Sequence, residues 1–202
     1  MIRIILVDDE HLIRSAIAGL LGLMDDIDVA GEFESGEEAL KLAPALEPTL
    51  AIVDLQLGGM DGIDTAIALM DKVPGLKTMI LTSHARPGYL KRALSSGISG
   101  FLPKTAMAQD LEKAVRDVAR GSRVVDPGLA ADTIAAGDSP LTPRETDVVE
   151  LAAHGAPIAD IARRAHLAEG TVRNYLSSAQ LKLGAKNRHE AVDIARAKGW
   201  LG

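Results

Sequence analysis

Residues 2–9 read IRIILVDD, a short apolar run that ends in two carboxylates. The run is rich in isoleucine and is too short for a buried helix, which favours a buried β-strand. Four similar runs follow along the chain, separated by segments with helical spacing. The five predicted strands are Ile2–Val7, Val29–Phe33, Leu50–Val53, Thr78–Thr82 and Gly100–Pro103.

Between these runs, apolar residues recur at helical spacing. The predicted helices are Leu12–Met24, Gly36–Ala45, Gly62–Met70, Tyr89–Ser96 and Ala108–Arg120. Strands that alternate with helices predict parallel βαβ units and therefore a doubly wound, five-stranded, flavodoxin-like α/β sheet. Four runs are almost continuously apolar, as expected when helices cover both faces. Gly31 and Glu32 interrupt the second run, which favours an edge position.

Composition narrows the class of protein. The 202 residues allow one large domain or two small ones, and 47% of them are hydrophobic, which is ample for packed cores. The absence of cysteine excludes disulfides and thiolate metal sites. No apolar run approaches the roughly 20 residues that span a bilayer. We therefore expect a cytoplasmic protein.

Net charge and the positions of glycine and proline divide the chain into two parts. Residues 1–138 hold 13 Lys+Arg and 21 Asp+Glu, a net charge of −8, whereas residues 139–202 hold 9 and 7, a net charge of +2. Glycine and proline recur between residues 121 and 140, and the sequence after them has helical spacing. We predict a first domain over 1–121, a linker over 122–139 with a short helix at Leu129–Ala136, and a second domain over 140–202.

Polar side chains lie at the ends of four predicted strands. Asp8 and Asp9 end the first, Asp54 the third, Thr82 the fourth and Lys104 the fifth. Parallel strands bring their carboxyl ends to one edge of the sheet, where ligands bind. Clustered carboxylates suit a magnesium ion (Mg2+), and a hydroxyl and an ammonium beside it can stabilise a phosphoryl group. Each aspartate alone is more simply a turn or cap residue, Thr82 alone a cap and Lys104 alone a solvated charge. The set as a whole favours a site with Asp54 as nucleophile.

The same stretches resemble the receiver domains of response regulators over residues 2–120. The matching segments are Ile4–Asp9, Val53–Asp54, Leu81–Ser83 and Gly100–Lys104. The resemblance implies that Mg2+ is bound by Asp9, by Asp54 and by the backbone carbonyl of Gln56, with Asp8 acting through water.

It further implies that Thr82 and Lys104 hold phosphoryl oxygens and that Phe101 is the aromatic residue that swings inward on activation. The alternative for Phe101 is an ordinary core residue. Gly58 stands where the family usually has proline, which predicts a looser loop.

Residues 142–202 are predicted to form four helices, Pro143–His154, Pro157–Ala165, Glu169–Leu183 and Arg188–Lys198. Thr142, Pro143 and Glu145 give the first helix a capping box. The second and third helices are joined by the short turn 166–168, which predicts a helix-turn-helix.

In a helix-turn-helix the N-terminal part of the second helix enters the major groove of DNA. The outward residues predicted to contact bases are Thr171, Arg173, Asn174 and Ser177. Those predicted to contact phosphates are Lys182, Lys186, Asn187 and Arg188. The alternative is that these residues form solvated helix faces.

The segments 141–145, 170–175, 182–183 and 186–188 together resemble the LuxR/NarL (FixJ) type of DNA-binding domain. Ala168 departs from the family, which usually has a serine cap there. Residues 85–89 and 170–175 resemble the branch that contains the membrane-lipid (fatty-acid desaturase) regulator of bacilli. The resemblance implies a two-component transcription factor, in which a sensor histidine kinase phosphorylates Asp54 and the protein then dimerises and binds promoter DNA. It also implies that the protein is not an enzyme beyond its own phosphorylation and dephosphorylation.

Two other functions remain open from the sequence. A Mg2+-dependent phosphatase with an aspartate nucleophile would also place carboxylates at strand ends, but Gln56 stands where such enzymes usually carry a second aspartate. A regulator that binds DNA independently of phosphorylation, with a degenerate receiver, is the third. The predicted homodimer would use Leu12, Ile13 and Ile17 or the face of the fourth and fifth helices.

Overall fold

The computed structural model describes residues 1–153, 155–165 and 167–201. The chain divides into two compact units. The first contains residues 1–85 and 90–129, and the second contains residues 86–89 together with residue 130 onward.

The first unit is built on a six-stranded parallel sheet with the order β2-β1-β3-β4-β5-β6. The strands are β1 Ile2–Val7, β2 Ile27–Phe33, β3 Leu50–Val53, β4 Lys77–Thr82, β5 Gly100–Pro103 and β6 Val124–Val125. The five predicted strands and the edge position of β2 are confirmed. The two-residue strand β6 lies within the predicted linker, and its pairing with β5 continues the sheet there.

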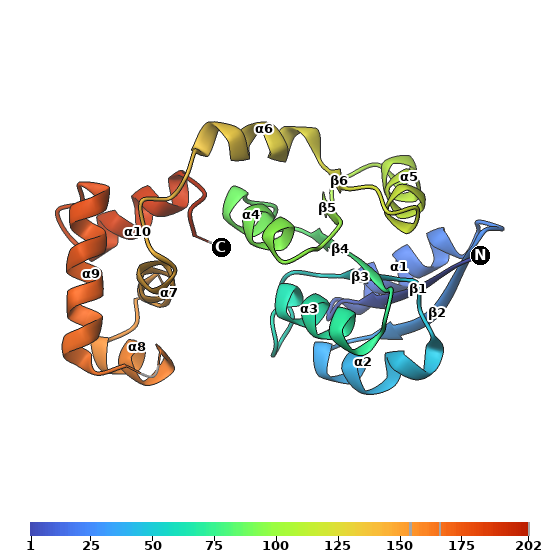
Figure 1. Cartoon of the computed structure of the whole chain (residues 1–202), viewed down its shortest axis with the longest axis horizontal. Coiled ribbons are helices and arrows are strands. Elements are labelled where there is room, and N and C mark those ends of the chain that lie inside the picture. The colour runs from blue at the N-terminus through green and yellow to red at the C-terminus, as the bar shows by residue number, and fades with distance from the viewer. Residues whose placement is uncertain (154, 166, 202) are drawn as a thin grey trace. The chain divides into compact units, whose positions relative to one another are not determined.

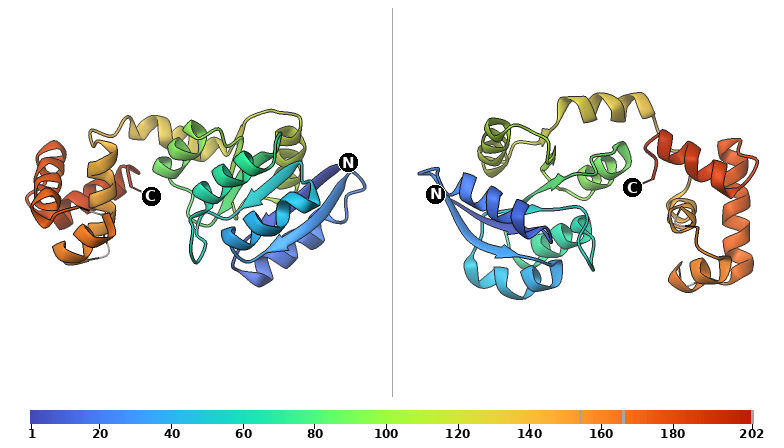
Figure 2. Two further views of the ribbon diagram at one scale, coloured as in Figure 1. Left: turned by 60° about the horizontal axis from the view of Figure 1, so that its bottom comes forward. Right: turned by 180° about the vertical axis from the view of Figure 1, so that it is seen from behind.

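Helices cover both faces of this sheet (Figures 1 and 2). The helices are α1 His11–Leu21, α2 Gly36–Leu42, α3 Gly62–Lys72, α4 Pro87–Ser95 and α5 Ala108–Ala119, with a 3₁₀ turn η1 at Ala43–Leu46. Helices α1 and α5 pack on one face, and α3 contacts β3 and β4 on the other. The predicted doubly wound α/β fold is therefore confirmed.

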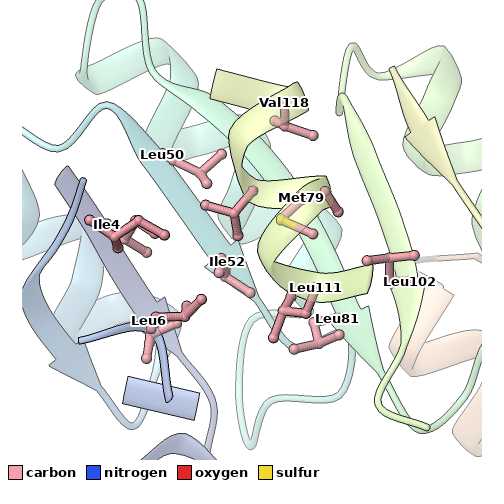
Figure 3. Close-up of a cluster of buried hydrophobic side chains, with 13 residues drawn as sticks. Ile4, Leu6, Leu50, Ile52, Met79, Leu81, Leu102, Leu111 and Val118 are labelled. Carbon is pink, nitrogen blue, oxygen red and sulfur yellow. The ribbon is translucent and has the colours of Figure 1, made fainter. Parts of the chain in front are cut away.

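The core under α1 and α5 fixes the positions of the strand ends. Figure 3 shows Leu111 and Val118 of α5 lying over Ile52 and Met79 of the central strands. Burying side chains of this size contributes about 1.5–3 kcal/mol each. The strands that carry the polar end residues are thus held in a rigid, densely packed layer.

The second unit is helical. Its helices are α7 Pro143–Ala152, α8 Ile158–Ala165, α9 Glu169–Leu183 and α10 Arg188–Ala197, preceded by α6 Pro127–Ala136. The four predicted helices are confirmed with end shifts of one or two residues, while His154 and His166 lie outside the described residues. The capping box between Thr142 and Glu145 is present as predicted. Ala168 makes no side-chain cap bond at the start of α9.

Side chains from all four of these helices form a second hydrophobic core. Its buried members include Val148, Ile161, Val172, Leu176 and Val192. The core holds α8 and α9 against each other. Among the described residues, no helix is both long enough and apolar enough to cross a membrane.

Candidate phosphoryl-transfer site and DNA interface

The acidic site forms where β1 and β3 end side by side. Val7 is in register with Val53, and the backbone N–H of Asp54 donates a 2.8 Å hydrogen bond to the carbonyl of Val7. Asp8 and Asp54 are both buried. The carboxyl ends of β1 and β3 are therefore neighbours.

Lys104, at the end of β5, joins the carboxylates of this edge. Its Nζ lies 2.8 Å from Oδ2 of Asp8 and 3.1 Å from Oδ2 of Asp54. It also lies 2.7 Å from Oε2 of Glu10. The Lys104 side chain is only 7% exposed, so its charge is strongly coupled to these three acids.

The surroundings shift the pKa values of two of these groups. Burial by itself lowers the pKa of Lys104, but its carboxylate partners outweigh burial and place that pKa above its usual range. Burial raises the pKa of the Asp8 carboxyl, and the hydrogen bond from Lys104 offsets this only in part. Lys104 is therefore held fully charged beside a carboxyl that burial disfavours as an anion.

Glu10 is a member of the site that the sequence analysis missed. Oxygens of Asp8, Glu10 and Asp54 lie within 4.8 Å of one another. Glu10 directly follows the predicted acid pair and stands at the N-cap of α1, where it makes no side-chain cap bond. Its position beside Asp8 and Asp9 was the available signal, but it could not show that the side chain reaches across to β5.

An open pocket of about 370 Å³ lies beside this cluster. It is lined by Asp9, Glu10, Asp54, Gln56, Leu57, Gly58, Ser83 and His84. Asp9 and Gln56 thus face the same space as Asp54. The lining by Ser83 and His84 was not predicted.

Thr82 and Phe101 lie under the surface instead. Thr82 is fully buried, and its Oγ1 accepts a 3.0 Å hydrogen bond from the backbone N–H of His84. Phe101 is also fully buried. In this structure Phe101 therefore occupies a core position.

The donor set of the site consists of oxygens. Carboxylates of Asp8, Glu10 and Asp54 converge, and Asp9 and Gln56 line the adjoining pocket. Hard divalent cations prefer oxygen ligands, and Mg2+ retains several waters when bound, for which an open pocket leaves room. The residues present therefore fit such an ion.

The loop after Asp54 is held tightly at both ends. The backbone N–H of Leu55 donates a 2.7 Å hydrogen bond to Oδ1 of Asp54, and that of Gly62 donates a 2.9 Å bond to the carbonyl of Leu55. A Cβ atom on Gly62 would lie 1.8 Å from the carbonyl oxygen of Asp54. Only glycine allows α3 to begin this close to the end of β3.

The same loop is also fastened by side chains. Asp61 caps α3 by accepting a 2.9 Å hydrogen bond from the N–H of Asp64. Arg92 of α4 binds Asp61 at 2.8 Å and Asp64 at 2.7 Å. Near Gly58 and its neighbours, the N–H of Met60 donates to Glu37 of α2 at 3.1 Å. Contacts with α2 and α4 thus hold the loop that lacks the usual proline.

The predicted base-contacting residues lie on the outer side of α9. Arg173, Asn174 and Ser177 are exposed and Thr171 is half-buried. Arg173 lies 2.8 Å from Glu169, one turn earlier in the helix. The exposed set therefore begins within the first two turns of α9.

The residues predicted to contact phosphates differ in their surroundings. Lys186 is exposed. Asn187 caps α10: its side-chain oxygen accepts 3.0 Å hydrogen bonds from the backbone N–H groups of His189 and Glu190. Arg188 donates to the carbonyl of Ala156 at 3.3 Å. Asn187 and Arg188 thus also stabilise the fold locally.

Lys182 is engaged with Glu145, a residue that the sequence analysis treated only as part of a capping box. Glu145 is 4% exposed. Its carboxylate accepts hydrogen bonds from Lys182 Nζ and Ser178 Oγ, both at 2.6 Å, and from the N–H of Thr142 at 2.7 Å. Glu145 therefore ties the start of α7 to the C-terminal half of α9.

These contacts make the second unit sensitive to acid. Burial alone raises the pKa of Glu145, but hydrogen bonds from Lys182, Ser178 and Thr142 outweigh it and lower the pKa to about 2 from 4.5. A carboxyl whose pKa is lower when folded stabilises the fold above its unfolded pKa. That contribution is lost as the pH falls from 4.5 towards about 2.

The variant Glu145→Gln provides a test of this acid sensitivity. We expect the wild type to exceed this variant in free energy of unfolding by about 3 kcal/mol near neutral pH. The difference should shrink as the pH falls below 4.5. Urea unfolding of both proteins over a series of pH values measures it, and a pH-independent difference would contradict the role of the ionised carboxylate.

Each unit matches a known protein family. Residues 4–116 match the family described as "Response regulator receiver domain". Residues 139–195 match the "Bacterial regulatory proteins, luxR family". The chain is 41% identical over 201 residues to the uncharacterized transcriptional regulatory protein YvfU of Bacillus subtilis, with 100% of both chains covered. It is 38% identical to the transcriptional regulatory protein DesR of the same organism, with 99% of both covered.

A solved structure is also similar over the whole chain. It is that of RcsB from Salmonella enterica serovar Typhimurium bound to promoter rprA in the presence of phosphomimetic BeF3-. The TM-score is 0.74 at 27% identity, with 96% of this chain and 97% of that chain covered. A further structure contains two RcsB dimers bound to two parallel DNAs, at a TM-score of 0.67 and 26% identity, covering 97% and 98%.

Proposed function

The chain belongs to the response regulators that join a receiver domain to a LuxR-type DNA-binding domain, and from this premise we propose that a sensor histidine kinase controls it through Asp54. The observation that carries the proposal is the ammonium of Lys104, 2.8 Å from Asp8 and 3.1 Å from Asp54 at one edge of the sheet. A buried cation between two strand-end carboxylates is suited to hold a phosphoryl group.

In the proposed reaction an Asp54 carboxylate oxygen bonds to the phosphorus of a phosphohistidine. The P–N bond breaks, and its electron pair returns to the imidazole of the kinase. Bound Mg2+ supplies charge neutralisation for the phosphoryl oxygens. Asp8, Asp9, Asp54 and the carbonyl of Gln56 would hold the ion.

Lys104 is the residue placed to accept a phosphoryl oxygen directly. Its Nζ already lies 3.1 Å from Oδ2 of Asp54, while Oδ1 accepts the N–H of Leu55. In the proposal Thr82 turns its hydroxyl to a second phosphoryl oxygen, and Phe101 follows into the space that Thr82 leaves. Water then hydrolyses the acyl phosphate and returns the site to its unmodified state.

The proposal extends to assembly and DNA. The receiver spans residues 1–121, a linker 122–139 and the DNA-binding domain 140–202, in a cytoplasmic protein that is not otherwise an enzyme. Phosphorylation promotes a homodimer, for which Leu12, 81% exposed on α1, offers an apolar contact. RcsB dimers bound to DNA support this arrangement by analogy. Paired α9 helices then read two half-sites of a promoter.

Phosphodonor labelling tests the proposal. With acetyl phosphate and Mg2+, the wild type should gain one phosphoryl group per chain by mass, whereas Asp54→Asn should be labelled at least about a hundredfold more slowly, because the nucleophile is lost. Asp71→Asn, an exposed position on α3, should be labelled like the wild type. Equal labelling of the Asp54 variant would remove Asp54 as the acceptor.

The two alternatives give different results in the same preparation. A regulator independent of phosphorylation would bind a selected DNA fragment equally well with and without phosphodonor. A Mg2+-dependent phosphatase would turn over small phosphate esters repeatedly. The proposal predicts phosphodonor-dependent DNA binding and no turnover of phosphate monoesters.

A further inference from the structure

The second unit has a small net positive charge for a DNA-binding domain, and one of its lysines is paired with a buried carboxylate. Residues 139–202 hold a net charge of +2. Lys182 lies in the last turn of α9, and its side chain is 34% exposed. Its Nζ is 2.6 Å from Oε2 of Glu145, a carboxylate that is almost fully buried. The lysine therefore lies near the surface with its charge already compensated.

The geometry around Glu145 favours this pairing over one with solvent. The carboxylate oxygens also accept bonds from Ser178 at 2.6 Å and from the N–H of Thr142 at 2.7 Å. These two donors hold the carboxylate in one orientation, so Lys182 meets a preorganised partner. Leaving such a buried carboxylate without its cation is costly.

Because Lys182 lies near the C-terminal end of α9, its pairing with Glu145 affects contacts with the DNA backbone. A helix in the major groove passes the sugar-phosphate backbone at its C-terminal end. A free lysine there binds any duplex alike, because phosphate contacts carry no sequence information. A lysine paired with a buried carboxylate adds nothing to this non-specific attraction.

We propose that Glu145 withholds Lys182 from DNA phosphates and thereby limits the affinity of the second unit for DNA of any sequence. Discrimination between sequences then depends on the exposed residues at the start of α9. The inference replaces the expectation that Lys182 contacts phosphate. It rests on the proposed function only in that α9 is taken as the helix that contacts DNA.

The salt dependence of binding to a duplex without a target site tests this inference. Each phosphate contact adds about 0.9 to the slope of log K against log salt concentration. We expect Lys182→Met to leave the wild-type slope unchanged. Glu145→Gln should steepen the slope by about 0.9, because the freed lysine reaches a phosphate. The double variant should return to the wild-type slope.

A steeper salt dependence also changes the affinity for the non-target duplex. Between about 200 and 50 mM salt, Glu145→Gln should gain roughly three- to fourfold more affinity for the non-target duplex than the wild type does. Its affinity for a duplex selected by the wild type from a random pool should rise by a similar factor, so that its preference between the two duplexes stays the same. A merely structural role predicts the opposite sign, with weaker binding to both duplexes and no steeper slope.

One matched variant completes the design. Ser178→Ala removes another donor to Glu145 without freeing a charge, and its slope should equal that of the wild type. Circular dichroism confirms which variants are folded, and if Glu145→Gln is not, Lys182→Met alone decides. A slope lowered by about 0.9 in Lys182→Met, or an unchanged slope in folded Glu145→Gln, overturns the inference. Salt-independent or absent DNA binding by the wild type would instead refute the proposed function.

Discussion

Replacing Gly62 with alanine is expected to destabilise the first unit by about 3 kcal/mol or more. A Cβ atom at this position would lie 1.8 Å from the Asp54 carbonyl oxygen and 2.9 Å from the Leu55 Cα. Both neighbours are backbone atoms at the end of β3, so no side chain can rotate away. Either α3 or the end of β3 must therefore shift. The phosphorylation of Asp54 should decrease as the folded state loses stability.

Gly19→Ala is the matched control for this prediction. Gly19 lies within α1, and a Cβ atom there meets nothing within 4 Å. Alanine in a helix is favoured over glycine by about 0.5–1 kcal/mol, so this variant should be slightly more stable than the wild type. Urea unfolding measures both changes. A Gly62→Ala protein as stable as Gly19→Ala would show that the close approach of α3 to β3 is not a real constraint.

Replacing Lys104 with methionine is expected to slow phosphoryl transfer to Asp54 by on the order of a hundredfold, because preorganised charge at the developing phosphoryl oxygens is lost. The same change should tighten Mg2+ binding severalfold. Lys104 now neutralises Asp8 and Asp54 at 2.8 and 3.1 Å. Without it, a divalent cation is the remaining partner for these buried acids.

The Lys104 prediction is specific because Mg2+ affinity should rise while the rate of phosphoryl transfer to Asp54 falls. Calorimetric titration with Mg2+ measures the first, and labelling by acetyl phosphate at saturating Mg2+ measures the second. Lys113→Met, at an exposed position on α5, should alter neither. If Lys104→Met bound Mg2+ more weakly than the wild type, Lys104 would be a structural support of the metal site rather than its competitor.

The strands were predictable because burial on both faces leaves a plain pattern. Ile2–Val7, Leu50–Val53 and Gly100–Pro103 were predicted with the observed bounds. The pair Val124–Val125 was not, because two residues have no periodicity and the surrounding glycines suggested a linker. Its strand conformation depends on the free edge of β5, which is a tertiary feature.

The candidate site was predictable in its strand-end residues and not in its long side chains. Asp8, Asp54 and Lys104 follow from topology, since parallel strands deliver their ends to one edge. The roles of Glu10 and Lys182 depend instead on which distant residues their flexible side chains contact. Glu10 reaches Lys104, 94 positions away, and Lys182 reaches Glu145, 37 positions away. Sequence spacing along one element carries no information about such pairs.

The carboxylate of Asp61 links the start of α3 to α4. One oxygen accepts the hydrogen bond that caps the first turn of α3, and the other pairs with Arg92 of α4. Because the side chains of Arg92 and Asp61 are 43% and 40% exposed, dissolved ions weaken that pair. The link between the loop after Asp54 and α4 should therefore be weaker at high ionic strength than in dilute buffer.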